Sequence, residues 1–184
     1  AQPVGPQGFT GDALQGLGGI LLSPSRGLFV FTPVFLFAIP AEVRAFRRTT
    51  DPRAPLLRAL VVGTLLTIAV YARWKVWWGG HSFGYRLLTE LALPLTILIA
   101  WDWDRIRASR IARPLFAAAV ALSVIVHALG AFQYPTAFNS DVDQDQTHLW
   151  DPVDTELVLR ARRTFGWRSR STAENRLSPI LRPA

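Results

Sequence analysis

Four long apolar stretches separated by arginine-rich loops constrain this chain more than any other feature of its 184 residues. The stretches cover residues 28–46, 56–74, 83–101 and 114–132. Each has about the 20 residues that a helix needs to cross the hydrocarbon core of a bilayer. We therefore expect an all-α membrane protein with about four transmembrane helices. Pro33 and Pro40 lie inside the first stretch and should kink or divide it, and Pro94 should kink the third.

The chain outside the apolar stretches predicts two further regions. Residues 1–27 should form an external lead with a short interfacial helix near residues 13–22, because about ten residues are too few to span a bilayer. The four-span region then covers residues 28–133. Residues 134–184 should form an extramembrane C-terminal tail that is partly disordered, because its last part is polar and rich in arginine. Within that tail, residues 154–163 are acidic at the start and basic at the end, which favours a short helix.

The charges of the loops predict the orientation of these helices. Five arginines lie in residues 42–58 and four in residues 102–113, while fewer cations lie on the opposite side. The positive-inside rule places the arginine-rich loops in the cytoplasm. The turn at residues 23–27, the loop at residues 74–86 and the C-terminus should then lie outside.

The overall composition excludes several kinds of site. A net charge of +7 would suit a nucleic-acid binder, but arginines that flank apolar stretches are typical of membrane proteins, so we expect no nucleic-acid partner. The chain has no Cys, and the acidic run at residues 141–145 lacks the Gly and Glu of a calcium loop. We therefore expect no metal and no cofactor. The chain also has no Met, even at position 1, and we interpret it as part of a longer protein.

Residues 74–86 form the most unusual connection, because they hold three of the seven Trp residues together with three Gly. Gly79 and Gly80 permit a tight backbone and the close approach of another group. Lys75 and Arg86 would face anionic headgroups or a phosphate. The simpler interpretation is an aromatic-belt hairpin between two membrane helices, with snorkelling cations at its ends.

The order of the residues adds a resemblance to this pattern. Residues 77–90 read Trp-Trp-Gly-Gly-His-Ser-Phe-Gly-Tyr-Arg-Leu-Leu-Thr-Glu, and residues 21–33 read Leu-Leu-Ser-Pro-Ser-Arg-Gly-Leu-Phe-Val-Phe-Thr-Pro. A looser third piece is Phe138-Asn139 followed by residues 149–151. In this order the pieces resemble the C-terminal half of bacterial polytopic glycosyltransferases of the GT-C type. Those enzymes are relatives of the protein mannosyltransferases and of the lipid A aminoarabinose transferases.

The resemblance implies a function in the cell envelope. Enzymes of this type move a sugar from a polyprenyl-phosphate carrier to an acceptor on the outer face of the bacterial inner membrane. Their general base is usually an acidic residue of the first external loop near the N-terminus. The resemblance therefore leaves the catalytic residue of this chain unknown, and implies that the chain works only with an N-terminal remainder of the same protein. It also implies that the donor's phosphate, lipid or sugar contacts the motif residues, namely Arg26, Lys75, Trp77, Trp78, Gly79, Gly80, His81, Ser82, Arg86 and Glu90.

The roles of two polar side chains and the class of the protein have further interpretations at the sequence level. Glu90 lies four residues after Arg86, so the pair could orient Arg86 toward a phosphate or simply neutralise itself at a helix end. His127, in the fourth stretch, is predicted to be a packed and hydrogen-bonded histidine. The whole chain could also be part of a transporter or flippase, or a non-enzymatic integral membrane subunit.

Overall fold

The computed structural model describes residues 6–47, 50–80, 82–132, 149–153 and 155–164, and this part of the chain is all-helical. The α-helices are α1 (Ala13–Leu22), α2 (Leu28–Phe31), α3 (Ala38–Arg47), α4 (Ala54–Ala72), α5 (Ala92–Trp101), α6 (Trp103–Ala108), α7 (Ala112–Phe132) and α8 (Glu156–Thr164). The 3₁₀-helices are η1 (Pro6–Phe9), η2 (Pro33–Phe37) and η3 (Arg86–Leu91).

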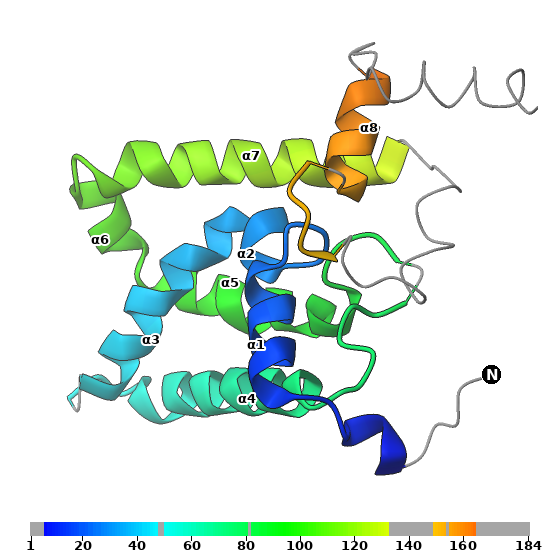
Figure 1. Cartoon of the computed structure of the whole chain (residues 1–184). Helices are drawn as coiled ribbons and strands as arrows, with labels where there is room; N and C mark the ends of the chain where they lie inside the picture. Colours follow the sequence, from blue (N-terminus) through cyan, green and yellow to red (C-terminus); the bar gives the residue numbers. More distant parts are fainter. Residues whose placement is uncertain (1–5, 48–49, 81, 133–148, 154, 165–184) are drawn as a thin grey trace, which may run out of the picture.

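The chain passes back and forth between two ends of the bundle (Figure 1). It runs through α2, η2 and α3 to one end, returns through α4, runs again through η3 and α5, and returns through α7. Helices α4 and α7 lie on opposite sides of the shorter helices, with α3 and α5 between them, and α1 runs across their direction. Helix α3 contacts both α4 and α5, while α7 contacts η2.

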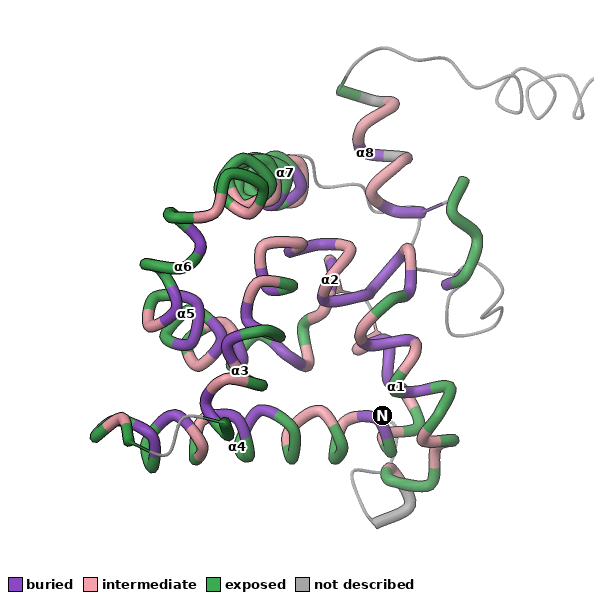
Figure 2. Tube along the Cα trace, turned by 90° about the vertical axis from the view of Figure 1, so that its left-hand side faces the viewer, coloured by how far each residue is buried: buried purple, intermediate pink, exposed green. Residues whose placement is uncertain are grey.

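Two helices, α4 and α7, are long and apolar enough to cross a membrane. Only 22% of the apolar window of α4 and 11% of that of α7 are buried inside the bundle. The core helix of a soluble protein would be mostly buried, whereas many positions of α4 and α7 are exposed (Figure 2). The exposed residues of both helices include Leu and Val. Such exposed apolar faces are compatible with helices that cross a bilayer.

The first predicted span is not one continuous helix. Helix α2 ends at Phe31, Thr32 adopts φ −135° and ψ 70°, and Pro33 starts η2. Proline suits this first position because its missing N–H would have no partner there. The predicted division of residues 28–46 is therefore confirmed at Pro33, while Pro40 lies in the first turn of α3, where it is tolerated.

The third predicted span also begins differently from the expectation. The chain is irregular up to Tyr85 and continues as η3, and α-helical geometry begins only at Ala92. Pro94 lies in the first turn of α5, so it marks a helix start and the kink expected at mid-helix was wrong.

Helix α1 agrees with the predicted short helix at residues 13–22. The Asp12 carboxylate caps it by accepting hydrogen bonds from the N–H groups of Leu14 and Gln15, both at 2.8 Å. Gly16 of α1 lies directly on the last turn of α4, because a Cβ there would stand 2.0 Å from the carbonyl oxygen of Ala72. The contact fixes α1 across the end of α4.

The predicted tail is described only in part. Helix α8 agrees with the short helix expected near residues 154–163, and it contacts α7. The predicted disorder of the last residues and the acidic run at residues 141–145 lie outside the described part of the chain.

Candidate functional site

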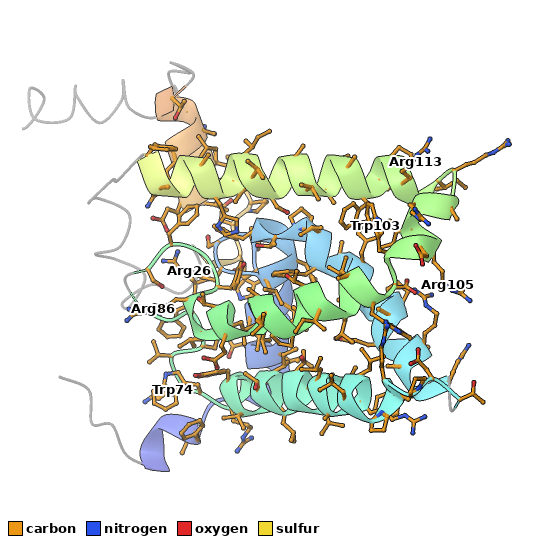
Figure 3. The ribbon with its side chains drawn as sticks, turned by 180° about the vertical axis from the view of Figure 1, so that it is seen from behind. Arg26, Trp74, Arg86, Trp103, Arg105 and Arg113 are labelled. Carbon is orange, nitrogen blue, oxygen red and sulfur yellow. The ribbon has the colours of Figure 1, made fainter. Side chains whose placement is uncertain are left out.

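The two ends of the bundle differ in the residues they carry. Arg26, Trp74 and Arg86 lie at one end, which we call the motif end, and Trp103, Arg105 and Arg113 lie at the other, which we call the arginine end (Figure 3). Arg26 and Arg86 belong to the two stretches that carry the resemblance, residues 21–33 and 77–90, so both stretches reach the motif end. These stretches and the second arginine-rich loop therefore lie at opposite ends of the bundle.

The turn at residues 23–27 is closed by its own backbone. The N–H of Gly27 donates to the carbonyl of Ser23 at 2.7 Å, and the hydroxyl of Ser23 donates to the carbonyl of Leu149 at 2.6 Å. Ser23, Ser25, Arg26 and Leu149 are all buried. The turn is thus tied to a segment more than a hundred residues away in the chain.

The loop at residues 74–86 needs its glycines for its backbone shape. Gly79, Gly80 and Gly84 have φ of 75°, 66° and 67°, a region that other residues rarely adopt. Gly84 also lies on an aromatic ring, since a Cβ there would stand 2.9 Å from Phe31. The sequence prediction of a tight backbone at Gly79 and Gly80 is confirmed.

The turn and the loop meet, and a narrow crevice lies between them. Its walls are formed by Ile20, Arg26, Trp77, Trp78, Gly84, Tyr85, Arg86, Leu87 and Leu88. The walls approach too closely for a water molecule to enter. Trp77 and Trp78 are buried in the core around Ile20 and Leu88, with their rings edge to face at 5.9 Å. These two Trp side chains therefore hold the loop in place, and they do not line an open path.

Arg26 is fully enclosed and faces a carboxylate of α8. Its Nη1 donates to Oε2 of Glu156 at 2.7 Å, and Nη2 of Arg160 donates to Oε1 of the same carboxylate at 2.5 Å. The exposed fractions are 1% for Arg26, 0% for Glu156 and 2% for Arg160. Arg160 also donates to the carbonyl of Gly130 at 2.8 Å and lies 4.5 Å over the ring of Phe83. One carboxylate thus joins the turn, the loop, α7 and α8.

Arg86 and Lys75 differ from Arg26 because both are exposed. Glu90, the predicted partner of Arg86, is also exposed and forms no ion pair with Arg86. The reason is local geometry: residues 86–91 form a 3₁₀-helix, in which positions four apart no longer share a face. Arg86 makes no ion pair within the described residues.

A second polar cluster lies beside the crevice. The hydroxyl of Thr32 is 2.7 Å from the hydroxyl of Tyr85 and 2.8 Å from Nε2 of His127. The rings of Tyr85 and His127 meet edge to face at 6.1 Å. His127 is therefore a hydrogen-bonded histidine, as predicted, although its side chain is exposed rather than packed in the core.

Sequence reasoning missed the residues that hold this end together, namely Glu156, Arg160 and Thr32. The spacing of Glu156 and Arg160 on one face of a predicted helix was a usable signal, but nothing in the sequence pointed it toward Arg26. Ser82 donates to the carbonyl of Gly79 at 3.3 Å, so it closes the loop, and His81 lies outside the described residues. No group of three potential metal ligands occurs within the described part of the chain.

Comparison with protein families, with curated proteins and with solved structures finds no match to this chain.

Proposed function

We propose that this chain is the C-terminal membrane portion of a GT-C-type glycosyltransferase that moves a sugar from a polyprenyl-phosphate carrier to an acceptor on the outer face of the bacterial inner membrane. One observation carries the proposal. The two stretches that resemble such enzymes, about 50 residues apart in the chain, pack against each other at the motif end around a shared crevice.

In this proposal all four apolar stretches cross the bilayer. Helices α4 and α7 span it without interruption, and the other two crossings are interrupted helices that lie between them, each with one buried face and one exposed face. With rises of about 2.0 Å per 3₁₀ residue and 1.5 Å per α residue, η3 and α5 together reach about 27 Å. That length approaches the roughly 30 Å of a hydrocarbon core, and interrupted helices are tolerated where protein surrounds them.

Arg86 and Lys75 are the proposed contacts for the carrier phosphate. Both are exposed at the motif end, and the planar fork of an arginine matches two phosphate oxygens. Arg26 takes a structural role in this proposal, because a carboxylate already occupies its guanidinium.

Binding of a short-chain polyprenyl monophosphate to the purified chain tests this assignment without the catalytic region. We expect Arg86→Ala to weaken binding about tenfold, because a charge-assisted hydrogen bond contributes roughly 1.5–3 kcal/mol. Arg86→Lys should recover only part of the affinity, since it keeps the charge and loses the fork. Tryptophan fluorescence can report the titration, because Trp74 and Trp77 lie in the same loop.

Arg73→Ala is the matched control, because Arg73 is also exposed near this end and does not line the crevice. Equal affinities for the wild type and all three variants would end the phosphate assignment. Sugar transfer is tested separately, in membranes that contain the complete protein with its polyprenyl-linked donor. If the chain binds the carrier and no sugar transfer occurs, the carrier-binding assignment is retained and the proposed glycosyltransferase activity is rejected.

A further inference from the structure

The two arginine-rich loops predicted to share one side of the membrane use their arginines differently. Arg44 of the first loop pairs with the buried Asp102, and Arg58 donates to the carbonyl of Ala45 at 3.2 Å. Asp51 accepts hydrogen bonds from the N–H of Arg53 and from Nε1 of Trp101. Two of the five arginines of the first loop, Arg44 and Arg58, therefore make contacts inside the protein.

The second loop, which joins α6 to α7, leaves its charge outside. Arg105, Arg110 and Arg113 are exposed and make no ion pair within the described residues. Arg107 pairs with Asp104 at 3.0 Å, but both side chains are mostly in solvent, and such a pair contributes little. Figure 3 shows Arg105 and Arg113 extending away from the bundle at the arginine end.

Apolar side chains stand among these cations. Ile111 is 74% exposed and Leu115 is 58% exposed, and Trp103 is exposed while its ring packs edge to face on Phe116 at 5.4 Å. Cations beside an exposed Trp and aliphatic side chains are the combination that favours the headgroup layer of a bilayer.

We propose that residues 103–115, which we call the arginine corner, form a binding surface for anionic phospholipid headgroups. Arg105, Arg110 and Arg113 bind headgroup phosphates through their planar forks, and Trp103, Ile111 and Leu115 enter the adjoining acyl boundary. The surface requires that α7 crosses a bilayer, and it is independent of any sugar transfer.

The test measures the preference for phosphatidylglycerol over phosphatidylcholine, and compares the wild type with variants of the arginine corner. The full chain is placed in nanodiscs of a roughly 7:3 mixture of phosphatidylcholine and phosphatidylglycerol, which matches a moderately anionic leaflet. The number of phosphatidylglycerol molecules retained after extraction is counted by native mass spectrometry. An arginine near an anionic surface changes the relative binding constant by about fivefold, so Arg110→Gln/Arg113→Gln should lower the preference about 25-fold at low salt. The preference of the wild type should also fall as salt is raised.

Two control variants make the result specific. Arg73→Gln removes an exposed arginine at the motif end and should leave the preference unchanged. Arg110→Lys/Arg113→Lys keeps the charge and should retain most of the preference while losing the contribution of the forks. Unchanged helix content of each variant in detergent shows that the fold persists.

Equal phosphatidylglycerol preference in the wild type and in Arg110→Gln/Arg113→Gln overturns the proposal. It is also overturned if the wild type shows no lipid preference and instead binds polyglutamate in detergent through the same two arginines, because the partner is then an acidic protein segment.

Discussion

The buried carboxylate of Glu156 allows the sharpest prediction about this fold. Glu156→Gln leaves one oxygen to accept a hydrogen bond and turns an amide N–H₂ toward a second arginine donor. Arg26 and Arg160, which are 1% and 2% exposed, would then lose their shared counter-charge in a place that solvent does not reach. Breaking a buried pair by removing one partner costs about 3–5 kcal/mol. The cost should appear as undocking of α8, because this carboxylate links α8 to Arg26 of the turn.

Hydrogen exchange followed by mass spectrometry measures this undocking directly. At about 1.4 kcal/mol per factor of ten, amide exchange in residues 156–164 should become about 10²–10³ times faster, while exchange in α4 changes little. Glu90→Gln is the matched control, since it makes the same chemical change on an exposed side chain of the motif end. Exchange of α8 that stays within about threefold of the wild type would refute the reasoning.

Two further predictions concern the loop at residues 74–86 and the orientation of the chain. Gly84→Ala should lower the thermal midpoint clearly more than Gly80→Ala. Both glycines have positive φ, which costs an alanine about 1–2 kcal/mol, but only Gly84 also lies on the ring of Phe31. Equal shifts of the two variants in a melting experiment would contradict this. A cysteine at Ser109 should resist a membrane-impermeant thiol reagent in intact cells, while one at Ser82 should react, and the reverse pattern would overturn the proposed orientation.

The helices that the sequence predicts correctly are those whose apolar run has a clear length and clear ends. The short apolar run at residues 13–22 forms α1, and the uninterrupted apolar residues of α4 and α7 form helices long enough to span a bilayer. The start of α5 did not follow, because apolar residues from 83 onward fit a helix as well as an irregular loop. What decides the loop is tertiary contact: Phe83 fills the space beside Gly130, and Tyr85 bonds Thr32. Neither partner is close in sequence.

The candidate site followed from sequence only as a location. The sequence predicted that the turn at residues 23–27 and the loop at residues 74–86 lie on the same side, and in the structure the two pack against each other. It could not show which cations are free, because that depends on where a distant carboxylate falls. Glu156 reaches Arg26 across 130 positions of the chain, a separation that no local pattern encodes.

Some arginines of this chain pair with a protein carboxylate and others are exposed, and this difference determines which of them can bind a phosphate. Arg26 is enclosed beside the carboxylate of Glu156, and the partly buried Arg44 pairs with the buried Asp102. A phosphate could replace such a carboxylate only by leaving another charge buried without its partner, at a cost of several kcal/mol. Arg86 at the motif end and the arginine corner at the other end face no such cost, because both are exposed. Phosphate recognition by this chain should therefore take place at the two ends of the bundle, which are the membrane surfaces in the orientation that we propose. The packing of the turn against the loop should hold the exposed cations of the motif end in position.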